Sequence, residues 1–399
     1  MKILFITARF PYPPLKGDQV RSYNQIRILS QKHSIILFSL IGNRKELDHI
    51  PMLKRFCSHI EVVELRPFHS YLNVISGLFS PLPLQTCYYY SPELGRRIRT
   101  TIENDKFDVV HVQLIRMAPY FTHFVHMPKV IDLIDALSLN MKRRYECDRG
   151  IFKLGTYIEW QRLKKYETEI CNQFDQAVVV SPTDRKAIGP FQNLHVNPNG
   201  VDTDAFPFVL EGREPFSIIF SGNMGYFPNV DAVHWFSQEV FPLIKARIPQ
   251  IKFYVVGADP LKGIRRLSAD ERIIVTGFVD NIYKYLARAT VAVCPIRSGS
   301  GIQNKVLEAM SSGTPVVATS YAVEGIQATP EEEIIIADDP VDFAQRVVEL
   351  LQDATLRQKL ALNARKLIEE KYTWEASVEQ LERIYQAAIA THSRNPTVP

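Results

Sequence analysis

The sequence predicts an α/β protein made of two Rossmann-like domains that face each other. A chain of 399 residues is long enough for two domains, each with its own core. Short apolar runs alternate with helical patterns, which is typical of doubly wound sheets. A strand that leads into a glycine loop and then a helix opens the chain, and the same order returns from Ser217 without a repeat of solenoid period.

The first half begins with a strand over residues 2–8, which are mostly apolar, as in a central parallel strand. Prolines at positions 11, 13 and 14 delay the next helix until near Asp18. Gly17 would then lie at the carboxyl edge of the sheet, where open α/β sheets bind ligands, unless it is part of a plain surface loop. Arg21 would face either a cleft or solvent. Further strands are predicted over residues 35–40, 60–65, 109–112, 129–133 and 177–180.

Three polar residues lie at the ends of these strands. His111 ends one strand and would either pack structurally or face a cleft. Asp132 and Asp135 lie at the end of an otherwise apolar strand, and a buried carboxylate needs solvent, a partner or a functional role. For Asp135, the sequence leaves two roles open, an active-site group or a helix N-cap, which Ser138 could also supply.

The second half restarts after an Asn-Gly turn at Asn199 and Gly200, where we place the domain boundary. A strand from Ser217 leads into a loop with Gly222, Asn223 and Gly225, followed by a helix from about residue 229. Two more strands are predicted over 253–257 and 273–279. Helical patterns cover 340–352, 355–372 and 374–388, and the last of them has one apolar stripe that predicts packing.

The most informative stretch runs from Val291 to Thr319 and predicts strand, glycine loop, helix and strand. Gly299 and Gly301 allow a tight turn and a close approach to a ligand. The next helix carries Lys305 and Glu308 in its first turns. A helix N-terminus favours an anion and a carboxylate can accept hydrogen bonds from sugar hydroxyls, so the pair suits a nucleotide diphosphate attached to a sugar. The alternative is a simple strand-to-helix turn with Glu308 in solvent.

The residues Ser298–Gly301, Lys305, Glu308–Met310 and Gly313–Val317 resemble the signature of retaining GT-B glycosyltransferases of family 4. The resemblance covers nearly the whole chain. It implies two Rossmann-like domains that face a central cleft, residues 1–198 on the acceptor side and 199–372 binding a nucleotide-sugar donor. Residues 373–399 would form a helix that crosses back to the first domain, and a tail. The segment 195–202 resembles the element that joins these domains.

The resemblance also implies which residues meet the donor. Glu308 would contact its ribose and Lys305 its phosphates, with Arg297 as further charge compensation. The loop glycines and polar residues would approach the phosphates, and the segment after residue 277 would meet the base. The remaining donor-binding candidates are Gly17, Gly222, Asn223, Gly225, Phe278, Val279, Gly299, Gly301, Ile302 and Gln303.

Two positions depart from the family pattern. Ser300 stands where the family has the first of two glutamates, and Ile134 stands where many members have a histidine before the aspartate. The catalytic candidates are therefore Asp135, His111 and Ser300.

The implied activity is transfer of a sugar, with retention at the anomeric carbon, from a UDP- or GDP-linked donor. No cofactor other than the donor and no metal is expected, and the acceptor would be a glycan or lipid-linked molecule in cell-envelope or exopolysaccharide assembly. A nucleotide-sugar epimerase, a phosphorylase and a catalytically silent sugar-binding protein are the alternatives on the same fold. An NAD-dependent enzyme is disfavoured because neither first loop has the Gly-x-Gly-x-x-Gly pattern.

Composition narrows the partners and the location. The net charge of +4 is too small to indicate nucleic acid, and five scattered cysteines indicate reduced thiols, not zinc or disulfides. No signal peptide or membrane-spanning run is recognisable, so we expect a cytoplasmic protein. Residues 67–99 and 141–165 combine aromatic and basic side chains, which suits peripheral binding to an anionic inner membrane face. For the second stretch, a solvated helix over 151–172 is the alternative.

Overall fold

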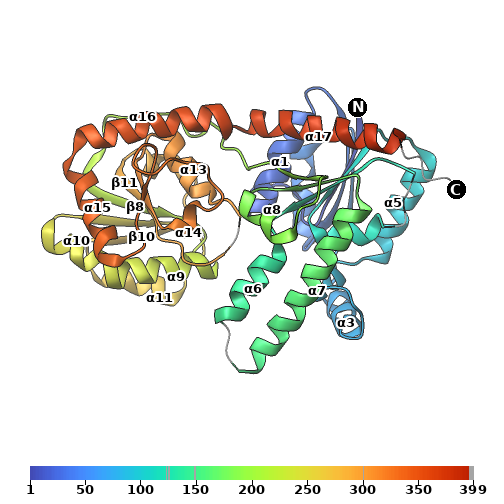
Figure 1. Ribbon diagram of the computed structural model, residues 1–399, viewed down its shortest axis with the longest axis horizontal. Helices are drawn as coiled ribbons and strands as arrows, with labels where there is room; N and C mark the ends of the chain where they lie inside the picture. The colour runs from blue at the N-terminus through green and yellow to red at the C-terminus, as the bar shows by residue number, and fades with distance from the viewer. Residues whose placement is uncertain (123, 125, 148–149, 300, 395–399) are drawn as a thin grey trace. The chain divides into compact units, whose positions relative to one another are not determined.

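The computed structural model describes the chain from residue 1 to 394, apart from residues 123, 125, 148–149 and 300 (Figure 1). The chain divides into two compact units. The first comprises Met1–Pro198 together with Ser377–Pro399, and the second comprises Asn199–Ala376. Each unit contains one parallel sheet with helices packed around it.

The first unit contains a seven-stranded sheet in the order β3-β2-β1-β4-β5-β6-β7. All of its strand pairs are parallel. Because both faces of its central strands are covered, β1, β4 and β5 consist almost entirely of buried residues. The strands are β1 (Lys2–Thr7), β2 (Ser34–Ile41), β3 (His59–Glu64), β4 (Val109–Gln113), β5 (Lys129–Ile134), β6 (Gln176–Val179) and β7 (Leu194–Val196).

Helices and short helical turns connect these strands. They are α1 (Gly17–Leu29), the 3-10 turn η1 (Arg44–His49), α2 (Ile50–Lys54), α3 (Pro67–Gly77), α4 (Leu84–Tyr88), α5 (Pro92–Asn104), the 3-10 turn η2 (Ile115–Tyr120), α6 (Leu137–Cys147), α7 (Ile151–Gln173) and α8 (Pro182–Ile188). Helices α6 and α7 pack against each other as a pair of long neighbours (Figure 1).

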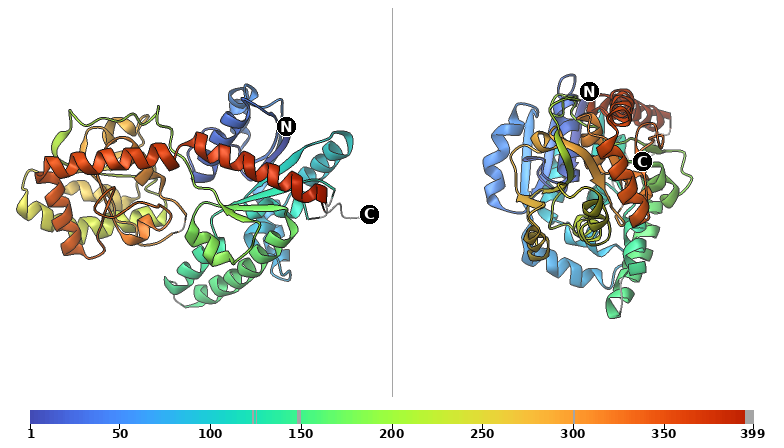
Figure 2. Two further views of the ribbon diagram at one scale, coloured as in Figure 1. Left: turned by 45° about the horizontal axis from the view of Figure 1, so that its top comes forward. Right: turned by 90° about the vertical axis from the view of Figure 1, so that its left-hand side faces the viewer.

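The last helix, α17 (Trp374–Arg394), packs on the first unit from Ser377 onward (Figure 2). Its apolar stripe, which includes Leu381 and Tyr385, joins the core formed by β1, β2 and β4. Polar contacts fix its start, because Ser377 Oγ donates to the Pro198 carbonyl at 2.8 Å and Gln380 Nε2 donates to the Val196 carbonyl at 2.7 Å. The predicted packing role of this stripe is confirmed.

The second unit contains a six-stranded parallel sheet in the order β10-β9-β8-β11-β12-β13. Its strands are β8 (Glu214–Ser221), β9 (Lys252–Val256), β10 (Ile273–Gly277), β11 (Ala289–Cys294), β12 (Val316–Ala318) and β13 (Ile335–Ile336). Its helical elements are α9 (Phe227–Trp235), a π-helical turn η3 (Phe236–Val240), α10 (Phe241–Arg247), α11 (Lys262–Arg266), the 3-10 turn η4 (Leu267–Ala269), α12 (Tyr283–Leu286), α13 (Asn304–Ser311), α14 (Ser320–Val323), α15 (Pro340–Gln352) and α16 (Ala354–Lys371).

Both sheets share the strand order that makes a doubly wound fold. In each, the chain starts in a central strand, adds strands to one side, and then returns to the other side of the first strand. The direction reverses between β1 and β4 in the first unit and between β8 and β11 in the second. Open α/β sheets bind ligands at the carboxyl ends of strands next to such a switch point.

The structure confirms the predicted strands and adds short ones. β7 and β13 were not predicted, because three residues and two residues are too short to show a period. The helix expected from about residue 229 starts at Phe227 and continues through the π-helical turn into α10. No helix in the described part of the chain has the length and apolar character needed to cross a bilayer.

The packing of α17 predicts a matched difference between two leucines. Leu381 is fully buried in the first unit's core, whereas Leu362 on α16 is about half exposed. Replacing Leu381 with Ala should lower the free energy of unfolding by about 2–5 kcal/mol because it leaves a cavity, and Leu362→Ala should change it by less than about 0.5 kcal/mol. Urea denaturation measures both. Equal effects of the two substitutions would show that α17 is not an integral part of this core.

Candidate functional site

Two glycines bring the ends of β8 and β9 into contact. Gly222 follows β8 and Gly257 follows β9, and a Cβ on Gly257 would lie 1.8 Å from the Gly222 carbonyl oxygen. Gly257 has φ +149°, a conformation that favours glycine. Asn223 closes the loop, because its Nδ2 donates to Asp259 Oδ2 at 3.0 Å and its Oδ1 accepts from the Gly225 N–H at 2.8 Å.

Lys305 lies beside this loop. Its Nζ donates to Asn229 Oδ1 at 2.5 Å, and Asn229 Nδ2 in turn donates to the Asn223 carbonyl at 2.8 Å. A Cβ on Gly222 would lie 2.8 Å from Asn229 Nδ2 and 3.3 Å from Lys305 Nζ. Only a glycine at position 222 therefore leaves space for the Lys305 ammonium and the Asn229 amide beside the loop. The structure thus brings Gly222, Asn223 and Lys305 together.

The Lys305 ammonium is poorly solvated, and burial lowers its pKa. The side chain lies over the Phe220 ring, with Nζ 4.8 Å from its centroid. Its hydrogen-bond partner Asn229 is a neutral amide, and no ion pair of Lys305 is found among the residues that the structure describes. Burial removes part of the hydration that stabilises the ammonium. An anionic ligand bound next to it would replace that stabilisation.

Glu308 lies one turn further along α13. Burial raises its pKa to about 7, an effect that the charge of Lys305 partly opposes. Its side chain is half-buried, and its carboxylate has no hydrogen bond within the described part of the chain. A carboxylate held this way can accept hydrogen bonds from hydroxyl groups of a ligand.

The loop after β11 lies along α9. Arg297 donates to both carboxylate oxygens of Asp231, at 2.7 and 3.1 Å, and lies over the Trp235 ring. Its charge is therefore paired within the protein by a partly exposed ion pair, and its predicted role in balancing donor phosphates stays a prediction. Lys305 is the better candidate for that role.

The glycines of this loop have positive φ, 117° at Gly299 and 76° at Gly301. The Gly299 carbonyl accepts a 2.8 Å hydrogen bond from Tyr321 Oη, and Ile302 packs against Gly325. Gln303 is the N-cap residue of α13, and its side chain makes no capping bond. Ser300 lies outside the described residues.

Phe278 and Val279 follow the last residue of β10, Gly277, whose φ is +72°. Phe278 is 65% exposed, so an aromatic ring is free to stack on a ligand at this edge of the sheet. The predicted role of this pair with the donor base stays a prediction.

In the first unit, Gly17 begins α1 and is exposed. Next to it, Asp18 accepts two hydrogen bonds from Arg9 Nη1, at 2.8 and 3.0 Å, and Arg9 Nη2 donates to Tyr89 Oη at 3.2 Å. A hollow of about 380 Å³ adjoins this edge, at the ends of β1 and β2. A ligand at Gly17 stays a prediction.

Arg21 does not face solvent, which corrects one of the two predicted orientations. It is fully buried, and its Nε donates to Asp132 Oδ2 at 2.6 Å, beside a second donor, Gln25 Nε2, at 3.1 Å. Asp132 therefore has the partner that a buried carboxylate needs. Its Oδ1 accepts from the Ile134 N–H at 3.1 Å, in a tight turn where Ile134 has φ +65°. A branched residue in this region is strained, so the Arg21–Asp132 pair holds the turn that presents Asp135.

Other acidic residues take the cap role that the sequence offered to Asp135 or Ser138. Asp184 Oδ1 accepts from the Ala136 N–H at 2.9 Å, and Glu167 Oε1 accepts from the Ser138 N–H at 2.9 Å. Within the described part of the chain, no residue forms a hydrogen bond with the Asp135 carboxylate. Burial and the nearby charge of Asp184 raise its pKa. The cap alternative is therefore disfavoured, and an active-site role for Asp135 stays a prediction.

His111 is a core residue. It is fully buried within β4, stacks on Phe5 with ring centroids 4.1 Å apart, and shares a 2.8 Å hydrogen bond with Tyr385 Oη of α17. Burial lowers its pKa to about 4, so the imidazole is neutral at pH 7. This position favours the structural alternative over the catalytic role.

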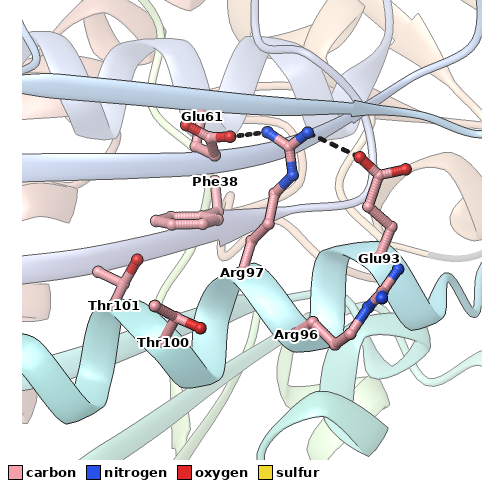
Figure 3. A pocket seen from close by; sticks show the side chains of 7 residues that line it. All are labelled: Phe38, Glu61, Glu93, Arg96, Arg97, Thr100 and Thr101. Carbon is pink, nitrogen blue, oxygen red and sulfur yellow. Dashed lines mark hydrogen bonds and ion pairs between the residues drawn. The ribbon is translucent and has the colours of Figure 1, made fainter.

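A hollow of about 500 Å³ on the other side of β2 is not a candidate site (Figure 3). Its charged side chains bind one another, because Arg97 lies between Glu61 and Glu93 and hydrogen-bonds to both. Three of the four charged side chains that line this hollow are therefore already paired with one another.

Sequence reasoning missed the partners of Lys305 and of the glycine loop. Asn229 was treated only as the start of a helix, and Asp259 and Gly257 were not singled out. Nothing in a local pattern marks them, because their roles depend on contacts between strand ends that lie more than 25 residues apart in the sequence. Gly257 was the one detectable case, as the glycine at the end of a predicted strand.

Comparison with known proteins finds glycosyltransferases along most of the chain. Residues 27–205 match a family model described as Glycosyltransferase Family 4, and residues 215–353 match one described as Glycosyl transferases group 1. An uncharacterised 44.6 kDa protein in the cps region of Klebsiella pneumoniae is 22% identical over 93% of this chain and 96% of its own length. An uncharacterised glycosyltransferase of Methanocaldococcus jannaschii is 24% identical over 73% of this chain and 78% of its own length.

Solved structures share the fold across the whole chain. Sucrose-phosphate synthase from Thermosynechococcus elongatus matches with a TM-score of 0.73 and 16% identity, covering 98% of this chain and all of that one. Anabaena HepE in complex with UDP and glucose matches with a TM-score of 0.68 and 16% identity, covering 97% of this chain and all of that one. Taken with the two family models, these matches show that the protein is a glycosyltransferase of the GT-B fold, similar to Glycosyltransferase Family 4 over residues 27–205 and to Glycosyl transferases group 1 over residues 215–353.

Proposed function

We propose that this glycosyltransferase transfers a sugar, with retention at the anomeric carbon, from a UDP- or GDP-linked donor to a glycan or lipid-linked acceptor. The observation that carries the proposal is the placement of Lys305 and Glu308 on one short helix, at the switch point of the second unit's sheet. The family resemblance supports retention, and a relative from a cps region supports a role in cell-envelope or exopolysaccharide assembly.

The donor would lie across the carboxyl ends of β8 and β11. Its diphosphate would meet Lys305 and the N-terminal N–H groups of α13, and its ribose hydroxyls would donate to Glu308. Developing negative charge on the leaving diphosphate would be balanced by the same ammonium and helix terminus. The proposal therefore needs no cofactor besides the donor.

The setting of Lys305 explains why it would act on the diphosphate. In the free protein its ammonium is bound only by a neutral amide and an aromatic face within the described residues, and burial lowers its pKa. Two phosphate charges would supply the anionic partner. On the acceptor side, the catalytic candidate is Asp135, whose carboxylate does not cap a helix. We propose that it acts on the acceptor or on the transferred sugar.

Replacing Lys305 with Met tests the phosphate role, because methionine keeps an unbranched side chain one atom shorter but removes the charge. The dissociation constants of UDP and GDP should rise by a factor equivalent to about 1.5–3 kcal/mol, while those of uridine and guanosine change little. Lys366→Met, which removes an exposed lysine of the same unit, is the control. Isothermal titration calorimetry measures each pair, and an equal loss for nucleoside and diphosphate would contradict the role.

The raised pKa of Glu308 predicts how donor binding depends on pH. Burial favours the protonated acid, with a pKa of about 7, whereas ribose hydroxyls donate to the ionised form. Affinity for a UDP- or GDP-linked sugar, whose phosphate charges are constant in this range, should fall about tenfold between about pH 8 and pH 6. Glu308→Gln should bind more weakly than wild type at the higher pH and show a flat profile. A wild-type profile that is equally flat would rule out this role for the carboxylate.

A further inference from the structure

Helix α3 exposes its apolar face to solvent. Six large apolar side chains from the helix and the two residues after it are exposed, Phe68, Tyr71, Leu72, Ile75, Leu78 and Phe79. They follow helical spacing of three and four residues, so they share one side of the helix. Phe79 is 92% exposed and Phe68 is 71% exposed. Such a face normally packs against the core.

The inward side of α3 is small and polar instead. Ser70 is fully buried, Gly77 lies against Cys87 of α4, and Asn73 Nδ2 donates to the Tyr90 carbonyl at 2.8 Å. These contacts fix the rotation of the helix about its axis. The outward direction of the apolar side chains is therefore set by packing and is not a result of loose attachment.

The first turns of α7 extend this face. Arg162 of α7 donates to the carbonyls of Gly77 and Leu78, at 3.1 and 2.8 Å, and so ties the middle of α7 to the end of α3. Ile158 and Leu154 lie one and two turns before Arg162 on the same side of α7, and both are exposed, as is Tyr157. We call these nine residues, seven from α3 and α7 together with Leu78 and Phe79, the α3/α7 face.

The surroundings of the α3/α7 face are basic. No acidic residue occurs between positions 66 and 92, and residues 137–165, which include α6 and most of α7, contain eight basic and three acidic residues. One of those three acids, Glu159, is used internally, because it accepts the backbone N–H groups of Leu84 and Gln85. The segments that carry and adjoin the apolar face thus have net positive charge, which we call the positive border.

We propose that the α3/α7 face binds the surface of an anionic membrane, with the apolar side chains inserted at the level of the lipid headgroups. An exposed apolar helix side with aromatic residues and neighbouring lysines and arginines is the pattern of interfacial membrane binding. The positive border favours anionic lipid over a second copy of this chain, which would bring the same charge to the contact. The inference rests on the proposed function only in that a lipid-linked acceptor would be reached at such a surface.

Vesicle co-sedimentation with a triple variant tests the proposal. Phe68→Ser, Ile75→Ser and Phe79→Ser together remove exposed side chains, so folding should be preserved. Wild-type protein should bind vesicles of phosphatidylcholine and phosphatidylglycerol more tightly than vesicles of phosphatidylcholine alone, and added salt should weaken the binding. The triple variant should lose binding on the order of tenfold or more. The control combines Leu261→Ser, Val341→Ser and Leu362→Ser, three comparably exposed apolar residues of the second unit, and should bind as wild type.

Three results would overturn the proposal: no vesicle binding by the wild type, equal losses in the variant and its control, or a wild-type dimer in sedimentation velocity without lipid that the variant abolishes. A Phe79→Trp variant adds a direct reading of insertion, since its added fluorescence should be quenched by brominated lipids. Titration of UDP and GDP separates this test from the proposed donor site, because nucleotide binding should be the same in the variant, the control and the wild type.

Discussion

The proposed donor site is built around one charged group, the Lys305 ammonium. It lies where three strand ends of the second unit's sheet meet, and glycines at positions 222 and 257 let the backbone come close enough to leave room beside it. Its partner is a neutral amide, held in turn by the loop it faces. A partly buried cation with such a partner costs free energy unless a ligand supplies the negative charge. The short helix that carries Lys305 also carries Glu308, so one element presents a cation and a carboxylate about one turn apart.

The first unit handles buried charge differently. Arg21 and Asp132 neutralise each other inside the core, and Asp184 and Glu167 are used to cap the start of α6. These groups are occupied by the fold itself. Asp135 follows directly on the strained turn that they hold, and its carboxylate is not used in the same way. Several buried charged residues therefore hold this one turn in place. Such a strained and well-supported turn indicates that the position of Asp135 is functionally important.

Much of the fold could be predicted from the sequence, because strands buried on both faces and helices with apolar stripes leave clear periods. The strand-loop-helix unit around Lys305 was predicted for the same reason, since glycines and a following helix are local signals. Contacts between distant segments were not predictable. For His111 the sequence left a structural role and a cleft position open, because the hydrogen bond that Tyr385 shares with it comes from more than 270 residues later. For Arg297 the sequence could not show the ion pair with Asp231. For α3, the sequence likewise showed only that the segment is rich in aromatic and basic residues. It could not show that the apolar side faces outward, because this direction depends on how Ser70 and Gly77 pack.

The most direct test of the central claim is thermal unfolding of the wild-type protein and of Glu308→Ala with UDP, GDP, ADP and NAD. A ligand at about 100 times its dissociation constant should add roughly 2.7 kcal/mol to the free energy of unfolding. The account predicts that UDP or GDP stabilises the wild type, and that a sugar conjugate of the same nucleotide stabilises it more than the Glu308→Ala variant. Stabilisation by NAD alone, or by none of the four, would contradict a nucleotide-sugar site at Lys305 and Glu308.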